Sequence, residues 1–365
     1  MAGVAVTLES RPDEVPPGTA AADVVGFLDT DLGRLLDRAA TATAADVGHA
    51  LASPRRGLDD LAVLLSGAAA ERLEDLAAAA HRLTVQRFGR TVRLFAPLYL
   101  SNECASTCTY CGFSAGNDIV RRTLSPAEVG AEAAVLRERG FRHLLLVSGE
   151  HARIVSRDYL EDCVRAVAAQ VPSVSVEVQV WDAPTYERLV AAGCEGLVVY
   201  QETYDRTTYA STHLKGKKRN YDWRADALAT AAHARALVRR WWRCQVTVSV
   251  PRLRPAAGDY HPSAPVGDRD MAQLACALRL VLPDVGLSLS TREDPALRDG
   301  LLRLGFTQMS AGSHTEPGGY AATSDAEPQF EISDSRSPEE VAVVLRRAGY
   351  EPVWMDTIGA RKVGP

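Results

Sequence analysis

The sequence predicts an α/β fold in which a parallel sheet closes into a TIM-type (β/α) barrel. Three observations support this prediction. Short apolar strands alternate with amphipathic helices after Arg90, polar side chains follow the ends of most of these strands, and three closely spaced cysteines follow the first of them. Repeated strand and helix units favour a parallel sheet, and barrel enzymes place their chemistry at the carboxyl ends of the strands.

Composition indicates one large globular domain with appendages. Of 365 residues, 46% are hydrophobic and 24% charged, as in ordinary globular proteins. A net charge of -5 gives no reason to expect nucleic acid binding, and no apolar run reaches membrane-spanning length. The N-terminal residues do not resemble a secretory signal, so we expect a cytoplasmic protein with reduced thiols.

Two segments are predicted before the barrel. Residues 1–20 are rich in Pro, Gly and Glu and are expected to be disordered. Residues 21–90 are expected to form a helical extension, because their Ala/Leu-rich segments have helical spacing. One stripe of this kind comprises Leu73, Leu76, Ala80 and Leu83.

Residues 91–315 are expected to form the barrel, and residues 316–365 a C-terminal extension packed on it. Apolar strands are predicted over Val92–Leu100, His143–Ser148, Val174–Val180, Gly196–Gln201, Gln245–Val250, Val285–Ser290 and Phe306–Ala311. Amphipathic helices are predicted between most of these strands. In one of them, Pro126–Arg139, Ser125 is a plausible N-cap and Glu128 follows three residues later.

Cys104, Cys108 and Cys111 lie on one loop with spacings of four and three. Three thiolates can hold three irons of a 4Fe-4S cluster and leave the fourth iron without a protein ligand. Such an iron can bind S-adenosylmethionine (SAM), which an electron then splits to release a carbon radical. Zinc is an alternative, although structural zinc takes four ligands and no fourth Cys or His lies close by in sequence. Thioredoxin-like use of the last two cysteines is another alternative, but it leaves the first without a role.

Short motifs are spread over most of the chain. They lie at Leu98–Cys104 with Cys111–Ser114, Arg121–Ser125, His143–His151, Val199–Tyr204, His213–Lys218, Pro251–Pro255, Ser288–Glu293 and Pro317–Tyr320. Together they resemble the radical SAM aromatic amino-acid lyases, and most of all the 2-iminoacetate synthases, the tyrosine lyases of thiamin thiazole biosynthesis. The resemblance implies that SAM is cleaved to 5'-deoxyadenosine and methionine. It also implies cleavage of the Cα–Cβ bond of L-tyrosine, which gives 2-iminoacetate (dehydroglycine) and p-cresol.

The resemblance also implies roles for individual residues. The cysteines would bind the cluster, and the residues expected beside SAM are Tyr110, Ser148, Gly149, Glu150, Gln179 and Glu202. An arginine would hold the substrate carboxylate through two parallel hydrogen bonds. The residues expected on the substrate side are Arg292 first and Arg252 second, with Tyr99, Ser290 and Ser313. A strand-end arginine could instead hold a loop by pairing with Glu293 or Asp294.

One departure from the family concerns the strand count. The family barrel has eight strands, whereas the interval between Gln201 and Gln245 here contains a predicted helical run, Ala225–Arg243, and no strand. We therefore expect a barrel that is open or closed by a substitute, or an in-frame deletion in the gene, with weakened or absent turnover. Two alternatives stay open: a tryptophan lyase that makes an indolic acid, and an impaired relative that acts as a binding partner of thiazole synthase.

The resemblance implies partners as well. A reductant such as flavodoxin or ferredoxin is expected, together with a small aromatic amino acid as substrate, and thiazole synthase is a further candidate. Tyrosine lyases of hydrogenase maturation carry a second cysteine motif near the C terminus. No cysteine follows Cys276 in this sequence, which disfavours that activity.

Overall fold

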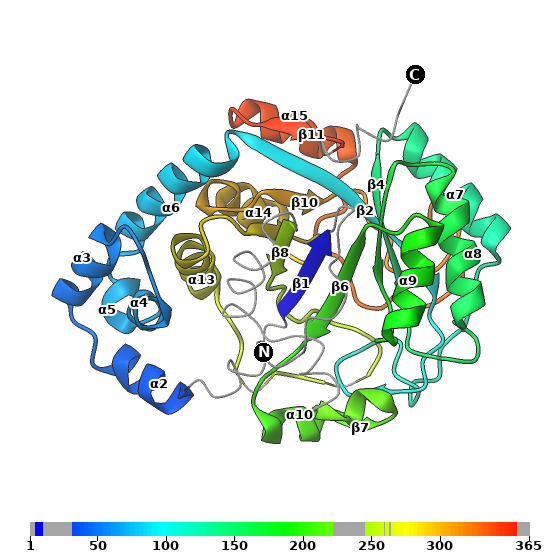
Figure 1. Cartoon of the computed structure of the whole chain (residues 1–365), viewed down its shortest axis with the longest axis horizontal. Helices are drawn as coiled ribbons and strands as arrows, with labels where there is room; N and C mark the ends of the chain where they lie inside the picture. Colours follow the sequence, from blue (N-terminus) through cyan, green and yellow to red (C-terminus); the bar gives the residue numbers. More distant parts are fainter. Residues whose placement is uncertain (1–3, 10–30, 222–244, 259, 263, 356–365) are drawn as a thin grey trace.

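A curled sheet lies at the centre of the computed structural model, which describes residues 4–9, 31–221, 245–258, 260–262 and 264–355 (Figure 1). Its parallel strands are β2 (Thr91–Ser101), β4 (His143–Ser148), β5 (Ser173–Glu177), β6 (Gly196–Gln201), β8 (Gln245–Ser249), β9 (Gly286–Leu289) and β10 (Gln308–Ser310). The last of these, β10, pairs in parallel with β2 and closes the sheet into a barrel. All the predicted barrel strands are therefore confirmed.

The place between β6 and β8 is taken by an N-terminal strand, β1 (Val4–Glu9), which is antiparallel to both neighbours. Figure 1 shows it in dark blue between them. The expectation of disorder is wrong for these residues, because Val4, Val6 and Leu8 alternate with smaller or polar residues as a strand requires. A substitute strand thus completes the barrel wall. The predicted helix Ala225–Arg243 lies outside the described residues.

Helices cover the outside of the sheet. They are α7 (Pro126–Glu138), α8 (Arg157–Ala168), α9 (Ala183–Ala192), α13 (Asp268–Val281) and α14 (Pro295–Leu301), with the short η2 (Leu302–Leu304). Their apolar residues and those of the strands form one buried core. At the start of α7, Ser125 and Glu128 form the reciprocal capping hydrogen bonds, so this predicted helix start is confirmed.

An N-terminal group of helices packs on α13. It comprises α2 (Leu32–Ala40), α3 (Ala44–Ala52), α4 (Leu58–Leu64), α5 (Gly67–Ala70) and α6 (Leu73–Phe88). Leu76 and Ala80 of the predicted stripe are fully buried and share an apolar cluster with Cys276 of α13. The helical prediction for this stripe is confirmed.

The chain after β10 returns over the carboxyl ends of the strands before it forms α15 (Pro338–Arg347) and β11 (Glu351–Val353). We call residues 311–337 the C-terminal strap. The strap donates from Ser333 N to Thr291 O (2.9 Å), and its Gln329 O accepts from Gly112 N (3.0 Å). Strand β11 pairs with the start of β2 at the opposite end of that strand. In the described part of the chain, no helix is long and apolar enough to cross a membrane.

Candidate functional site

Two adjoining cavities open at the carboxyl ends of the barrel strands. The first, which we call the cysteine cavity, has about 1080 Å³ of space, part of it open to solvent, and is lined by Cys104, Cys108 and Cys111. The second, the barrel cavity, has about 790 Å³ and reaches into the sheet. Both are lined by Val147, Glu177, Val198, Tyr200, Arg292 and Phe330. Their combined size suits a cofactor and a small substrate side by side.

The cysteine loop follows β2 and is fixed by polar contacts to its own backbone. Arg121 donates to the carbonyl oxygens of Asn102 (2.6 Å) and Phe113 (2.8 Å), and Asn117 Nδ2 donates to those of Cys111 and Gly112. Because these donors satisfy carbonyl groups that no regular element pairs, the irregular loop holds one conformation.

A short ribbon connects the loop to the segment after β6. There β3 (Thr107–Cys108) pairs antiparallel with β7 (His213–Lys215), which follows α10 (Arg206–Thr212) and precedes η1 (Lys217–Arg219). The pairing brings Lys218, the last residue of the motif His213–Lys218, to the cysteine cavity.

Two glycines allow close approach to the loop. A Cβ on Gly149 would lie 2.2 Å from the Glu103 carbonyl oxygen, and one on Gly216 would lie 2.4 Å from Ser106 Oγ. Both distances are far inside van der Waals contact, and Gly216 also has a φ of 87°, which other residues rarely adopt. Gly149 thus lines the cavity because its backbone can touch the cysteine loop.

The cysteines form a donor set that suits a cluster. All three are free thiols and surround one cavity, where the buried Ser148 Oγ has no hydrogen-bond partner among the described residues. No group of three His, Cys, Asp or Glu side chains in the described residues is arranged to hold a single ion. A cubane takes one thiolate at each of several corners, so its ligands need not converge on one point.

Burial keeps these thiols protonated in the absence of iron. It raises the pKa of Cys108 to about 12, although Lys218 lowers that pKa, and it raises the pKa values of Cys104 and Cys111 as well. Metal binding must therefore displace protons, and the nearby ammonium group favours the thiolates that result.

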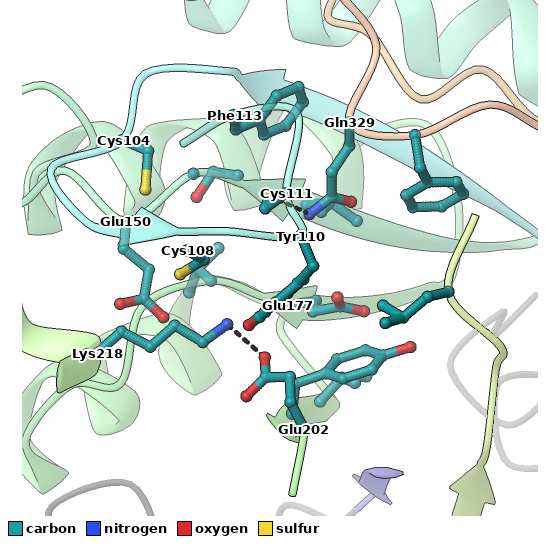
Figure 2. A pocket seen from close by; sticks show the side chains of 18 of the residues that line it. Cys104, Cys108, Tyr110, Cys111, Phe113, Glu150, Glu177, Glu202, Lys218 and Gln329 are labelled. Atoms are coloured by element: carbon teal, nitrogen blue, oxygen red, sulfur yellow. Dashed lines mark hydrogen bonds and ion pairs between the residues drawn. The ribbon is translucent and has the colours of Figure 1, made fainter. Parts of the chain in front are cut away.

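A polar network lines the side of the cysteine cavity predicted for SAM. Glu202 forms an ion pair with Lys218 (Figure 2). Its Oε2 lies 3.6 Å from His213 Nε2. His213 is buried and lies 2.7 Å from the Tyr110 hydroxyl. Glu150 also lines this cavity, and its carbonyl accepts from Ala105 N (2.9 Å).

The substrate-side residues lie around the barrel cavity. Arg292 lines both cavities, and in the described part of the chain no carboxylate pairs with its guanidinium. Tyr99 is buried with its ring edge-on to Phe113, and burial raises its pKa. Ser290 Oγ accepts from Arg292 N (3.2 Å), and Ser313 Oγ is buried without a partner among the described residues.

Two predicted site residues lie outside both cavities, which corrects their predicted roles. Arg252 is committed to Glu293 and to Asp268 (2.8 Å), so its guanidinium holds a loop. Gln179 is buried, and its amide donates to the Val155 carbonyl oxygen (3.0 Å). It follows the end of β5, whereas Glu177, the last residue of that strand, faces the cavities.

The sequence did not predict a site role for several residues that line the cysteine cavity. They include Glu177, Tyr200, Lys218, Arg254, Gln329 and Phe330. Glu177 and Tyr200 lie within predicted strands, Arg254 follows one, and Lys218 lies in the motif His213–Lys218, so each of these four had a signal in the sequence. The last two belong to the C-terminal strap, and nothing in the local sequence signals their proximity to cysteines more than 200 residues earlier.

Comparison with known proteins gives consistent matches over most of the chain. Residues 98–239 match the Radical SAM superfamily, and residues 249–351 match the Biotin and Thiamin Synthesis associated domain. The 2-iminoacetate synthase of Escherichia coli (strain K12) is 43% identical over 342 residues, which cover 86% of this chain and 91% of that protein.

Solved structures also match over most of the chain. A crystal structure of HydG, a maturase of the [FeFe]-hydrogenase, matches with a TM-score of 0.83 and 29% identity, covering 92% of this chain and 82% of that one. HydG from Carboxydothermus hydrogenoformans matches with a TM-score of 0.76 and 27% identity, covering 93% and 83%.

The comparison with the E. coli protein also contains a gap. Its 342 aligned positions exceed the residues in the 86% of this 365-residue chain that they cover. That relative therefore contains residues that have no counterpart here, as expected if this chain lacks one of the parallel strands.

Proposed function

Because the chain belongs to the 2-iminoacetate synthase family within the radical SAM superfamily, we infer that it is a carbon–carbon lyase acting on L-tyrosine. The reaction breaks the Cα–Cβ bond and yields 2-iminoacetate and p-cresol, while SAM is cleaved to 5'-deoxyadenosine and methionine. The observation that carries this assignment is 43% identity over 86% of the chain. The product 2-iminoacetate is the family's contribution to the thiazole of thiamin.

The cofactors are a 4Fe-4S cluster and SAM. Cys104, Cys108 and Cys111 would hold the cluster, which when bound supplies the electron for cleavage of the SAM sulfonium. The free thiols around one cavity support these three as ligands.

We propose that the cysteine cavity receives SAM. Tyr110, Ser148, Gly149, Glu150 and Glu202 line it. The hydroxyl of Ser148, which has no hydrogen-bond partner among the described residues, and the carboxylate of Glu150 can accept from the SAM ammonium group. Glu202 is held by Lys218 and is suited to contact the ribose or the amine. Gln179, which lies outside the cavity, has no part in this proposal.

We propose that tyrosine binds where the two cavities meet. Arg292 can hold the carboxylate through two parallel hydrogen bonds, and the carboxylate of Glu177 can attract the ammonium group. Tyr99, Ser290 and Ser313 line the adjoining barrel cavity and can contact the substrate from that side. This placement would hold the amine beside the SAM site and exclude water, so that proximity decides which hydrogen is lost.

Further parts of the proposal concern the surroundings of the enzyme. We propose a cytoplasmic location, a flavodoxin or ferredoxin as reductant, and thiazole synthase as a possible recipient of the product. The predicted domain boundaries also stay a prediction. They divide the chain into residues 1–20, 21–90, 91–315 and 316–365.

The test supplies anaerobically reconstituted protein with reductant, SAM and either tyrosine or tryptophan. We expect 5'-deoxyadenosine, p-cresol and glyoxylate, the hydrolysis product of 2-iminoacetate, with tyrosine only. An indolic acid from tryptophan without p-cresol from tyrosine would instead assign a tryptophan lyase. Absence of both products from iron-loaded protein would leave the role of a binding partner.

A further inference from the structure

Gln329 of the C-terminal strap connects the cysteine loop to Tyr99 on the substrate side of the site. Figure 2 shows its side chain beside Cys111. Its Nε2 donates toward Cys111 Sγ at 3.9 Å, and its Oε1 accepts a 2.7 Å hydrogen bond from the Tyr99 hydroxyl. A phenol hydroxyl that donates to the amide oxygen leaves the amide NH₂ as the end that faces the sulfur. Tyr99 therefore sets the orientation in which Gln329 meets the cysteine.

The backbone around Gln329 is built closely onto the same loop. Gln329 N donates to Thr315 O (2.9 Å), and Gln329 O accepts from Gly112 N (3.0 Å). A Cβ on Gly112 would lie 2.6 Å from the carbonyl oxygens of both Pro328 and Gln329. Only glycine permits this approach, so Gly112 is required for the contact between strap and loop.

Hydrogen bonds to the sulfurs of an iron–sulfur centre are one of the protein's means of setting its reduction potential. Reduction adds negative charge, and a donor at a ligand sulfur stabilises that charge more than it stabilises the oxidised form. A donor amide at a cysteine ligand therefore raises the potential, and its removal lowers it.

We propose that Gln329 is a positioning residue that hydrogen-bonds the Cys111 thiolate and raises the reduction potential of the bound cluster, with Tyr99 holding its amide in place. This inference rests on the proposed function for the presence of a cluster. It adds a residue of the C-terminal strap to the electronic environment of the site, through a side chain that the cysteine spacing does not reveal.

The experiment compares the midpoint potential of the reconstituted wild-type protein with those of Gln329→Leu and Gln329→Glu, by redox titration monitored by electron paramagnetic resonance (EPR). Leucine removes the donor, and glutamate replaces it with an acceptor of nearly the same shape. We expect a lower potential for leucine and the lowest for glutamate. Tyr99→Phe should give a smaller decrease, because the amide stays but loses its fixed orientation.

Gln170→Leu is the matched control. Gln170 follows α8, accepts a hydrogen bond from Arg137 of α7 (2.7 Å) and lines neither cavity. The midpoint potential of this variant should therefore equal that of the wild type. Unchanged potentials in both Gln329 variants would overturn the proposal. Loss of the cluster in both would overturn it too, because the residue would then hold the cluster instead of tuning it.

The same samples separate this inference from the proposed function. Wild-type protein that forms p-cresol while the Gln329 variants keep the wild-type potential refutes the inference alone. A wild-type protein with a cluster but no p-cresol refutes the lyase assignment, while lowered potentials in the variants would still support the inference.

Discussion

The guanidinium carbon of Arg292 lies 3.8 Å from the centre of the Phe330 ring. A cation placed on an aromatic face gains electrostatic attraction while its N–H donors remain available at the edge. Phe330 belongs to the C-terminal strap and Arg292 follows β9, so this contact joins two distant segments at the border of the two cavities. The strap therefore shapes both the carboxylate receptor and, through Gln329, the cysteine loop.

Arg292→Lys should impair tyrosine use. Lysine keeps the charge but cannot offer two parallel donors or stack on Phe330 in the same way. Loss of one hydrogen bond to a charged group costs about 1.5–3 kcal/mol, so kcat/KM for tyrosine should fall roughly 10- to 150-fold. Steady-state kinetics measure this, with unchanged SAM binding. Arg252→Lys is the control, and an equal loss there would speak against Arg292 as the carboxylate receptor.

Strand β1 should be needed for closure of the barrel. Val6 stands opposite both Val199 of β6 and Val248 of β8, and proline at this position cannot donate to the ladder. Val6→Pro should increase hydrogen exchange in β6 and β8 and lower the Tm, whereas Val6→Thr should leave both near their wild-type values. Hydrogen exchange in β6 and β8 that is the same in Val6→Pro as in the wild type would contradict the role of β1.

Turnover should be weaker than in the E. coli relative. An antiparallel six-residue strand replaces a parallel strand at the wall that carries Tyr200 and Glu202, so contacts to SAM on that side differ. The measurement is the rate of 5'-deoxyadenosine formation, normalised to bound iron, for both proteins under the same conditions. Equal rates would show that the substitute strand serves as well.

The ion pair of Arg298 with Asp334 should make stability depend on pH. Burial raises the pKa of Asp334, but the guanidinium groups of Arg336 and Arg298 lower it by more, so the net shift is downward. A folded-state pKa below the unfolded value of about 3.9 means that the carboxylate stabilises the fold at higher pH. This contribution is lost as the pH falls below about 4.

Asp334→Asn tests this dependence. Breaking a buried pair costs about 3–5 kcal/mol, so urea unfolding at pH 7 should show a loss of that order, and the difference from wild type should narrow below about pH 4. Asp299→Asn, which removes only a surface partner of Arg336 (2.9 Å), should cost about 0–1 kcal/mol. A difference for Asp334→Asn that does not change with pH would exclude this ion pair as the cause.

Local patterns predicted the barrel strands and part of the lining of the cysteine cavity. Apolar runs specify each parallel strand, and the residues after them meet at one end because parallel strands share a direction. The sequence predicted site roles for Cys104, Cys108, Cys111 and Gly149 in this way, because one loop and one strand end position them locally.

The remaining features depend on contacts between distant segments. Val4–Glu9 becomes a strand because β6 and β8 leave a place between them, and composition averaged over the first twenty residues hides its alternation. Gln179 hydrogen-bonds the Val155 carbonyl oxygen, and Arg252 forms an ion pair with Glu293. The motifs around Gln179 and Arg252 do not specify these partners. Gln329 is positioned by Tyr99 and Cys111, which lie 230 and 218 residues earlier in the chain.

The most direct test is the EPR spectrum of the anaerobically reconstituted, reduced protein before and after addition of SAM. We expect the signal of a 4Fe-4S cluster, a change of that signal when SAM binds, and loss of both in Cys104→Ala, Cys108→Ala and Cys111→Ala but not in Cys163→Ala. Reconstituted protein that shows no cluster signal, or a cluster signal that SAM leaves unchanged, would contradict the account.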